Sequence, residues 1–452
     1  MHSSRPGFWR RHRIIPWARP RNRIPGRALR CPAAGLFHHS GQTAGDTSSA
    51  VWLLFIRCAR SSLSCGTPSF VLMDHRLNIL QTCFSTSWGG LEMQALEVTR
   101  CLHERGHRLW LAAPEESRLF RESTRLPFTV LPLNVTGYAH PLLIWKLSRF
   151  LRREAIDVVH CQHSRDLATV VPAHHLARSH GPVLLSKRVG SYIRKRDPLH
   201  RYTYGRLSRV LAISDVIHRN VVATTPIAPE KVLTFHDAVD LSQFNPASVD
   251  RRAVRNSLGI PGDLPLFGFV GRFSPGKGHE ELLDAVAILD AQSRAFHTVI
   301  VGEASHGEET YAAAIRTRAH TLGLDARLTF LGYRADIPSL MAAFDILVFP
   351  SHAESFGVVL IEAMAMGLAV VATNCDGVLD IVVDGETGIM VPPKDGRRLA
   401  EAMDTLLQDA PLRARMGTAG RKRVEALFDQ ERQISRLEAL YYELLRRDKA
   451  TA

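Results

Sequence analysis

The chain has 452 residues, 45% of them hydrophobic, so it is long enough for two or three domains with substantial cores. It contains no run of 18 apolar residues, which argues against a membrane-spanning helix. The formal net charge of +13 is concentrated at one end: residues 1–72 hold 11 arginines, no lysine and one acidic residue, whereas the remainder has 46 basic and 43 acidic residues. This distribution argues against a nucleic-acid-binding protein.

Residues 1–72 differ from the rest of the chain. They are rich in Arg, Pro, Ser and Gly and show neither a helix nor a strand period. Three origins fit this composition: a disordered tail, a transit peptide, and a start codon assigned too early. Met73 directly precedes Asp-His-Arg-Leu-Asn-Ile-Leu, which is typical of the first strand of a domain. We therefore expect translation to start at Met73 and this segment to lie outside the fold.

The cysteines indicate a reducing compartment. Three of the seven fall in the Arg-rich segment, at Cys31, Cys58 and Cys65. The other four are Cys83, Cys101, Cys161 and Cys375, and no pair has the C-x-x-C spacing. The pattern predicts neither a disulfide framework nor a zinc site, and it favours the cytoplasm.

Short apolar runs alternate with longer amphipathic stretches from residue 76 onward, the pattern of parallel sheets covered by helices. In the first half we predict strands at Leu77–Cys83, Leu109–Ala113, Phe128–Leu133, Ile156–His160, Val183–Ser186 and Val210–Ser214. A helix is expected at Leu91–Glu104, because its apolar residues have helical spacing and Arg105-Gly106 follows as a stop.

The second half repeats the alternation. Strands are predicted at Leu266–Val270, Thr298–Val301, Arg327–Leu331, Ile346–Phe349 and Ala369–Thr373. Helices are predicted at Glu280–Leu289, Tyr311–Thr321, Ile337–Ala343, Ser355–Met366 and Arg397–Leu407. The pattern breaks at Phe244-Asn245-Pro246, which suggests domains at 73–245 and 246–428 and a terminal helix in 429–452. The chain is thus expected to be an α/β protein with two Rossmann-like domains that bind ligands at their strand ends.

Two motifs in the first domain follow predicted strands. Gly89 and Gly90 precede a helix, where paired glycines let a phosphate or sugar approach the backbone, although an ordinary strand–helix turn has the same sequence. His160 and His163 end the strand near Val159 and are candidates for catalysis or substrate positioning; packing or helix capping is the alternative.

A basic stretch with interleaved aromatic residues runs from Lys187 to Tyr204. Its members are Lys187, Arg188, Tyr192, Ile193, Arg194, Lys195, Arg196, Arg201, Tyr202 and Tyr204. We interpret it as a surface for an anionic membrane or a phosphorylated glycolipid, with a solvated loop and nucleic acid as the alternatives.

The loop Gly271–His279 follows a predicted strand and carries two cations. The Arg272 guanidinium can bind a diphosphate bidentately, and Lys277 adds a mobile point charge. Together they can stabilise a departing nucleoside diphosphate without a metal ion, whereas the alternative is a solvated basic loop. The loop lacks Gly-Lys-Ser/Thr and is therefore not a P-loop.

The most informative stretch spans residues 350–367 and follows the apolar strand Ile346–Phe349. Its sequence is Pro-Ser-His-Ala-Glu-Ser-Phe-Gly-Val-Val-Leu-Ile-Glu-Ala-Met-Ala-Met-Gly. We expect Glu354 at the mouth of a helix and Glu362 about 12 Å further along its axis, at about 1.5 Å per residue. A helix N-terminus binds phosphate, so a nucleotide sugar with hydroxyls on either side would fit; two solvated glutamates are the alternative.

The 350–367 string and the Gly-Arg…Lys-Gly element at 271–278 closely resemble the signature of glycosyltransferase family four, the retaining nucleotide-sugar enzymes of the GT-B fold. The resemblance extends from Met73 to the C-terminus and is strongest over residues 271–392. Two departures are visible: Ala369 stands where the family usually has proline, and the segment 376–380 replaces Gly-Gly-x-x-Glu.

The resemblance implies a role for each matching residue. Glu354 would contact hydroxyls of the donor sugar, and Glu362 would hold the ribose diol. The other implied donor contacts are Gly89, Gly90, Gly271, Arg272, Lys277, Tyr333, Arg334, Ser355, Phe356 and Gly357, with Tyr333 and Arg334 at the nucleotide base. The catalytic group would comprise Arg272, Lys277, Glu354 and a histidine beside the reacting sugar, for which we choose His163 over His160.

The expected activity is transfer of a sugar, with retention, from a nucleotide-sugar co-substrate to a hydroxyl of a glycan or glycolipid. We expect no metal, no other cofactor and no nucleic-acid partner. Bacterial relatives point to lipopolysaccharide or capsule synthesis, in the cytoplasm or at the inner face of its membrane. The alternatives are a soluble enzyme that makes a disaccharide or glycosylates a small molecule, and an idle module that binds nucleotide sugars or membranes.

Overall fold

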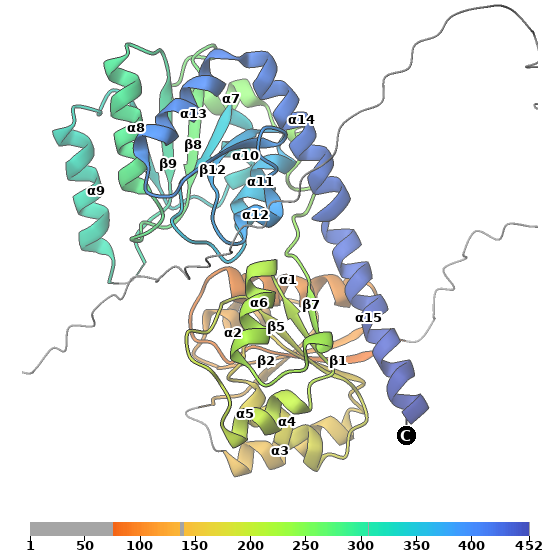
Figure 1. The fold of residues 1–452 in the computed structure, drawn as a ribbon. Helices are drawn as coiled ribbons and strands as arrows, with labels where there is room; N and C mark the ends of the chain where they lie inside the picture. Colours follow the sequence, from red (N-terminus) through yellow and green to blue (C-terminus); the bar gives the residue numbers. More distant parts are fainter. Residues whose placement is uncertain (1–75, 136–139, 306, 452) are drawn as a thin grey trace, which may run out of the picture. The chain divides into compact units, whose positions relative to one another are not determined.

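A computed structural model describes residues 76–135, 140–305 and 307–451 (Figure 1). The Arg-rich segment 1–72, with the expected start at Met73 and the cysteines Cys31, Cys58 and Cys65, lies outside the described residues. The four cysteines that are described, Cys83, Cys101, Cys161 and Cys375, are buried free thiols.

The first sheet has seven parallel strands in the order β3-β2-β1-β4-β5-β6-β7. The strands are β1 (Asn78–Thr82), β2 (Arg108–Ala113), β3 (Thr129–Pro132), β4 (Val158–Cys161), β5 (Val183–Lys187), β6 (Arg209–Ala212) and β7 (Val232–Thr234). The chain adds strands to one side of β1 and then to the other, so the order reverses between β1 and β4. Such a switch point opens a crevice at the carboxyl ends of the strands.

Helices cover both faces of this sheet. They are α1 (Gly90–Glu104), α2 (Arg118–Ser123), α3 (Pro141–Arg153), α4 (Leu167–Leu176), α5 (Pro198–Gly205) and α6 (Asp215–Thr224). Adjacent residues of β1 show the alternation: Ile79 packs into the cluster that contains Leu102 of α1, whereas Leu80 packs into the cluster that contains Leu151 of α3. Both faces of the sheet are therefore buried, as a parallel sheet requires.

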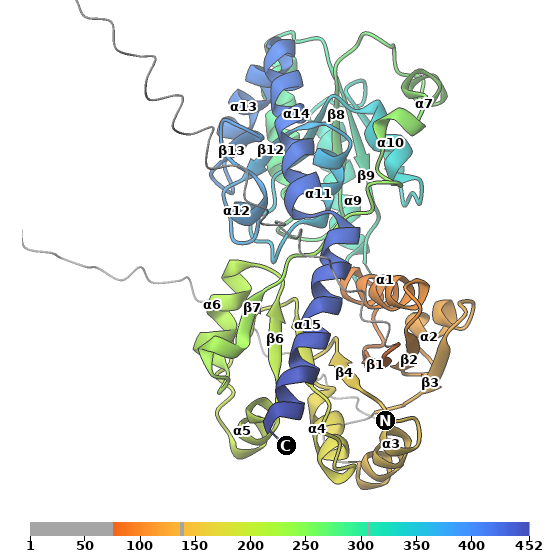
Figure 2. The same ribbon diagram turned by 90° about the vertical axis from the view of Figure 1, so that its right-hand side faces the viewer.

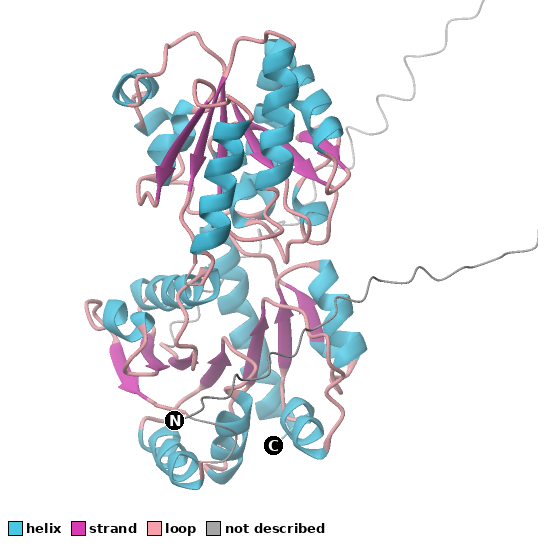
Figure 3. Cartoon of the chain, turned by 90° about the vertical axis from the view of Figure 1, so that its left-hand side faces the viewer, coloured by secondary structure: helices cyan, strands magenta, loops and turns pink. Residues whose placement is uncertain are grey.

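The second sheet has six parallel strands in the order β10-β9-β8-β11-β12-β13. Figure 3 shows the strands of the molecule in magenta with helices packed around them. They are β8 (Leu266–Val270), β9 (His297–Val301), β10 (Leu328–Gly332), β11 (Ile346–Phe349), β12 (Ala369–Thr373) and β13 (Gly388–Val391). The strand order reverses between β8 and β11. This places a second switch point at the centre of the sheet.

Two helical layers also enclose this sheet. The helices are α7 (Arg251–Ser257), α8 (His279–Ala291), α9 (Glu309–Thr321), α10 (Ile337–Ala343), α11 (Val358–Ala365), α12 (Val378–Ile381), α13 (Gly396–Gln408) and α14 (Ala410–Leu427). One face packs on α8, α9 and α13 through Leu282, Ile315 and Leu399. The other packs on α10 and α11 through Leu340 and Leu360.

The last helix, α15 (Gln430–Thr451), follows α14 after a short break and packs on the first sheet and α1 (Figure 2). Its apolar face consists of Ile434, Leu437, Leu440, Tyr441 and Leu444. Glu438 holds it at the end of α1, through an ion pair with Arg105 at 2.9 Å and a hydrogen bond with His107 at 2.9 Å. Among the described helices, none has the length and apolar character needed to cross a lipid bilayer.

The α/β class with two parallel-sheet, Rossmann-like units is confirmed, and every predicted strand is present within two residues of its expected bounds. Strands β7 and β13 were not predicted. The predicted helix at Ser355–Met366 is wrong at its start, because α11 begins at Val358. Gly357 precedes it with φ of 111°, a backbone conformation that a helix cannot contain.

Candidate donor and acceptor sites

Lys277 and Glu354 meet at the switch point of the second sheet. Lys277 lies between β8 and α8, Glu354 lies between β11 and α11, and Lys277 Nζ is 2.5 Å from Glu354 Oε2. β8 and β11 are neighbours in the sheet, so the two loops open side by side at its carboxyl edge. The side chains keep 25% and 18% of their surface exposed, which leaves the pair open to a ligand.

The two loops approach so closely that glycine is required between them. Gly278 has φ of 80°, and a Cβ added there would lie 2.1 Å from the Pro350 carbonyl oxygen. The His352 amide donates to the Gly276 carbonyl at 2.8 Å, and His352 Nε2 contacts Glu281 at 2.9 Å. The glycines of the Lys-Gly element therefore set the distance between the loop of Lys277 and the loop of Glu354.

The late start of α11 lengthens the loop that carries Glu354. Because the helix begins at Val358, Glu354 lies in the loop that leads into it and not directly before its first residue. The estimate of about 12 Å along one helix axis between Glu354 and Glu362 is therefore wrong. Ser355, Phe356 and Gly357 form the loop that enters α11, and the Phe356 side chain is buried.

Gly377 contacts the backbone of the loop that carries Glu354. Its amide donates to the Glu354 carbonyl at 2.9 Å, and a Cβ at Gly377 would lie 2.3 Å from the Ser355 carbonyl oxygen. Residues 376–380 are the segment where the sequence departs from the family pattern. The departure retains a glycine at the position that touches the Glu354 loop.

Glu362, on α11, is a carboxylate without a protein partner. No described residue gives it a hydrogen bond or an ion pair. Although part of the residue's surface is accessible, desolvation of the carboxyl group raises its pKa to about 7. A group of this kind can accept hydrogen bonds from a ligand's hydroxyls.

Arg272, Tyr333 and Arg334 follow strands on the β8–β10 side of the same carboxyl edge. The exposed Arg272 guanidinium donates to Ser305 Oγ at 2.9 Å. Arg334 forms a two-point pair with Asp336, at 2.7 and 2.6 Å, and Tyr333 is 63% exposed. The sheet thus brings Gly271, Arg272 and Lys277 into one loop and leaves Tyr333 and Arg334 at its edge strand.

The paired glycines of the first domain are less constrained. Gly89 precedes α1 in an extended conformation, and a Cβ there would make only an ordinary contact, 3.7 Å from Glu92 Oε2. A Cβ at Gly90 would meet no atom within 4 Å. The structure therefore leaves open space beside Gly90, whereas a side chain at Gly89 would lie in ordinary contact with Glu92.

His160 is part of the protein core. Its Nδ1 lies 2.7 Å from the Tyr441 hydroxyl, and its Nε2 lies 2.9 Å from Ser186 Oγ. Burial, and after it the charge of Arg188, lowers its pKa to about 3, so it stays neutral. Both ring nitrogens are used, and this leaves no donor or acceptor for a substrate.

His163 lies two residues beyond β4 and keeps 29% of its side chain exposed. Its Nδ1 is 3.9 Å from Asp166 Oδ1, and Asp166 is held by Thr82 at 2.8 Å. Burial and the charges of Arg165, Lys187 and Lys195, in that order, lower the pKa of His163 to about 4. The His163 imidazole is therefore neutral and accessible, and it lies near three cations.

The basic stretch does not form a single surface. Tyr204 is buried, and Arg188 forms an ion pair with Asp237 beneath the loop. Tyr192 and Ile193 are 97% and 76% exposed, and Arg194 and Arg196 are exposed beside them. The exposed members of the expected patch are therefore Tyr192, Ile193, Arg194, Arg196 and Arg201, whereas Lys187 and Tyr204 are buried.

Contacts that the sequence did not reveal connect the first domain to the Glu354 loop. Ser214 Oγ donates to the Ser355 carbonyl at 2.6 Å. His236 stacks on Phe356, with ring centroids 5.5 Å apart, and its Nε2 lies 3.2 Å from Asp380 Oδ2. These partners are more than 100 residues apart in the chain, so no local signal could predict them.

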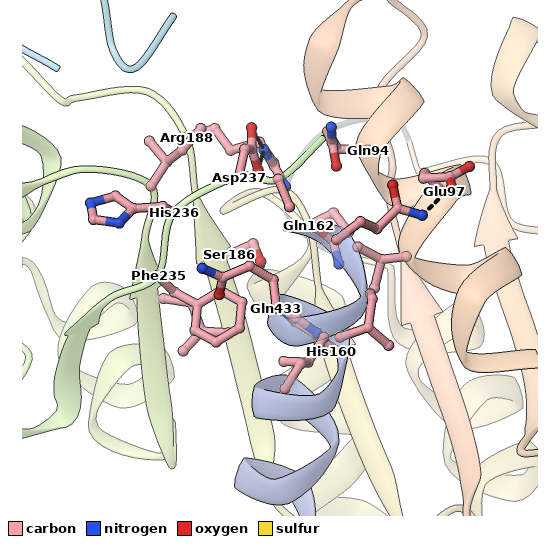
Figure 4. Close-up of a pocket in the computed structure, with 17 residues that line it drawn as sticks. Gln94, Glu97, His160, Gln162, Ser186, Arg188, Phe235, His236, Asp237 and Gln433 are labelled. Carbon is pink, nitrogen blue, oxygen red and sulfur yellow. Dashed lines mark hydrogen bonds and ion pairs between the residues drawn. The ribbon is translucent and has the colours of Figure 1, made fainter. Parts of the chain in front are cut away.

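A pocket opens beside the carboxyl ends of β4 to β7 and is closed by α1 and α15 (Figure 4). His160, Gln162, Ser186, Arg188 and Asp237 contribute its polar wall. Within it, the buried Gln162 Oε1 and Arg188 Nε have no hydrogen-bond partner among the described residues. The pocket therefore contains polar atoms whose hydrogen-bonding capacity the described residues do not fill.

Two Rossmann-like units, each built on a parallel sheet with a switch point, match the GT-B class of glycosyltransferase folds. Residues 250–423 match the profile of Glycosyl transferases group 1, and residues 88–243 match Glycosyltransferase Family 4. The chain therefore belongs to the glycosyltransferases that these two models, group 1 and Family 4, describe together.

Named relatives agree with this assignment. The chain is 32% identical over 292 residues to D-inositol 3-phosphate glycosyltransferase of Mycobacterium tuberculosis. The match covers 64% of this chain and 57% of the relative, so it spans little more than half of the relative's length.

Solved structures share the fold. A glycosyltransferase from Rickettsia africae superposes with a TM-score of 0.74 at 22% identity, covering 82% of this chain and 99% of the other. Anabaena HepE, in complex with UDP and glucose, gives a TM-score of 0.69 at 23% identity, covering 82% and 100%.

Proposed function

We propose that the protein transfers a sugar, with retention of configuration, from a nucleotide-sugar donor to an acceptor hydroxyl. The observation that carries the proposal is the Lys277–Glu354 pair at the switch point of the second sheet. Glu362, a carboxylate on the adjoining helix with no partner among the described residues, supports it further. A cation for phosphate and two carboxylates for hydroxyls match the three parts of a nucleotide sugar.

The proposed chemistry needs only these groups. Lys277 and Arg272 hold the diphosphate and stabilise the charge that develops on its leaving oxygen, so that no metal ion is required. Glu354 accepts hydroxyls of the donor sugar, and Glu362 accepts the ribose diol. The bond from the anomeric carbon to the phosphate oxygen breaks, and the acceptor oxygen bonds to the same face. The acceptor proton goes to the leaving phosphate oxygen.

The first donor to test is a UDP-sugar, because the structurally similar HepE binds UDP and glucose. The purified chain is incubated with UDP-, GDP-, ADP- and CMP-sugars, and release of the nucleotide is measured with EDTA present and absent. Proton NMR of the sugar product then reports its anomeric configuration. Inversion of the anomer, or release that EDTA abolishes, would contradict the proposed mechanism.

We further propose that the acceptor side works at an anionic membrane surface on the cytoplasmic side. The exposed Tyr192 and Ile193, flanked by Arg194 and Arg196, support this. Sedimentation with anionic vesicles tests it, and a soluble enzyme for small molecules or disaccharides predicts no pelleting. The narrower expectation of a lipopolysaccharide or capsule acceptor stays a prediction.

The competing function is an idle module that binds nucleotide sugars without turnover. It predicts that Lys277→Ala and Glu354→Ala leave the biological role of the protein intact. If the protein catalyses the transfer reaction, both variants should abolish its biological role. Complementation of a deletion strain with each variant separates the two.

A further inference from the structure

Lys187 is the last residue of β5, and its buried side chain lacks a partner. Only 9% of its surface is exposed, and no described residue forms a hydrogen bond or an ion pair with its ammonium group. Burying a lysine without a counter-charge is costly, so a residue of this kind is a candidate binding group for an anionic ligand that supplies the missing charge. Burial, and after it the charge of Lys195, lowers its pKa to about 8.

Two further cations converge on the same place. β5 is the neighbour of β4 in the sheet, so Lys187 and the loop after β4, with His163 and Arg165, lie at the same carboxyl edge. The positive charges of these three residues, Arg165, Lys187 and Lys195, each lower the pKa of His163. Neither Arg165 nor Lys195 forms a side-chain hydrogen bond or ion pair with any residue that the structure describes.

The loop that carries Lys195 is fixed in place. Asn220 of α6 accepts from the Ser191 amide at 2.7 Å and donates to the Ser191 carbonyl at 3.1 Å. The Lys195 amide donates to the Thr224 carbonyl at 2.7 Å. These bonds tie both ends of the turn to one helix and hold Lys195 near its cationic neighbours.

Asp166, the carboxylate beside His163, does not neutralise this cluster. Asp166 Oδ2 accepts from Thr82 at 2.8 Å, and its Oδ1 accepts from the Phe84 amide at 3.2 Å. Desolvation raises the pKa of Asp166 to about 7, so it carries only part of a negative charge near neutral pH. The cluster therefore retains an excess of positive charge beside His163.

We propose that the acceptor of this enzyme carries a phosphate group, which Lys187, Lys195 and Arg165 bind beside His163. The inference rests on the proposed function, because it assigns the acceptor for that reaction. Three unpaired cations, one of them nine-tenths buried, suit a dianion better than a neutral sugar. The phosphate belongs either to a soluble phosphorylated polyol or to a lipid headgroup, since both offer the same oxygens.

The test measures the affinity of the full chain for inorganic phosphate and for glycerol 3-phosphate, at constant ionic strength. It uses the Lys277→Met background, so that the diphosphate site does not contribute. Adding Lys187→Met is expected to weaken phosphate binding by about 10- to 100-fold, the usual effect of one charged hydrogen bond. The matched control is Lys146→Met, an exposed and unpaired lysine on α3, which should change the affinity by less than about twofold.

Two readouts separate this inference from the proposed function. UDP titrated into the Lys187→Met single variant should bind as in the wild type, because the donor site is unchanged. If UDP binds but phosphate affinity is the same with and without Lys187, the acceptor inference is overturned and the donor assignment stands. If UDP does not bind to the wild type, the proposed function fails whatever the phosphate result. Should Lys187→Met not fold, Arg165→Gln and Lys195→Ala provide the same test at the rim of the cluster.

The source of the phosphate is decided by vesicles of phosphatidic acid with phosphatidylcholine. Pelleting that Lys187→Met abolishes and Lys146→Met retains identifies a lipid headgroup. Binding of glycerol 3-phosphate without Lys187-dependent pelleting identifies a soluble phosphorylated acceptor. Phosphate binding that Lys146→Met weakens as much as Lys187→Met would contradict the site.

Discussion

Lys277 and Glu354 form an ion pair, 2.5 Å between Nζ and Oε2, that joins two loops 77 residues apart in the chain. The pair occupies the switch point of the second sheet, where a donor diphosphate would displace it. In the proposed complex each side chain would then gain a partner of its own, because the ammonium group would bind the phosphate and the carboxylate would be free to accept sugar hydroxyls.

This exchange predicts different effects for the two residues. Lys277→Met should weaken binding of UDP by about 10- to 100-fold, because it removes a charge-assisted contact to phosphate. Glu354→Gln should leave UDP affinity within about threefold and weaken UDP-glucose selectively. Titration calorimetry of both ligands measures this, with the exposed Lys422→Met on α14 as control. Equal losses of UDP affinity in both variants would argue against separate roles.

Glu362 predicts a pH dependence of donor binding. Its pKa is about 7 in the described structure, and hydroxyls that donate to the carboxylate favour its ionised form. Binding should therefore release a proton, and affinity for UDP-glucose should rise about tenfold from pH 6 to pH 8. UDP-glucose is the ligand of choice because its diphosphate does not titrate in this window. A slope that persists in Glu362→Gln would assign the effect to another group.

The same carboxyl group should affect stability with the opposite slope. Its pKa is raised above the unfolded value of 4.5, so its contribution is fully present below pH 4.5 and is lost as pH rises through 7. The melting temperature of ligand-free protein should therefore fall less between pH 5 and pH 8 in Glu362→Gln than in the wild type. Thermal unfolding across this range checks the prediction; identical slopes would mean that Glu362 is solvated.

Gly278 should tolerate no side chain. Gly278→Ala forces a positive φ on a residue with a Cβ and drives that atom to within 2.1 Å of the Pro350 carbonyl oxygen. We expect a loss of at least about 2 kcal/mol in the free energy of unfolding. Gly205→Ala, at the end of α5 with no atom within 4 Å of the new Cβ, should stay within about 0.5 kcal/mol. Urea unfolding compares them, and equal stabilities would contradict the close approach of the two loops.

Loss of the His160 contact should affect stability, whereas loss of His163 should affect activity. Tyr441→Phe removes the hydroxyl bonded to His160 and should lower the free energy of unfolding by about 1–3 kcal/mol. Because the pKa of His160 is lowered to about 3, its stabilisation is present above pH 6.5 and is lost as pH falls towards 3. His163→Ala should instead leave the melting temperature unchanged and lower the transfer rate by about 100-fold or more. A destabilised but fully active His163→Ala would assign this histidine to packing.

Strands with long apolar runs, such as Leu266–Val270, could be predicted because both faces of a parallel sheet are buried. The two strands that were not predicted, β7 and β13, have three and four residues and lie at sheet edges. The start of α11 was missed because the positive φ of Gly357 is a property of the folded backbone, and glycine alone does not indicate it.

The residues of the candidate site could be predicted from the sequence, but the contacts between them could not. Lys277 and Glu354 stand in recognisable motifs, but only the strand order brings them together. His160 and His163 could not be distinguished by spacing, because the partner that occupies His160 is Tyr441, 281 residues away. The unpaired state of Lys187 likewise depends on which side chains the fold leaves out of its reach.

The most direct test of the account is a binding titration of the full chain with UDP, GDP, ADP and CMP and the corresponding sugars, repeated with Lys277→Met. The account predicts that one nucleotide family binds and raises the melting temperature, and that Lys277→Met weakens this binding by about 10- to 100-fold. Binding that Lys277→Met leaves unchanged, or no binding of any of these nucleotides to the folded wild type, would contradict a donor site at the Lys277–Glu354 pair.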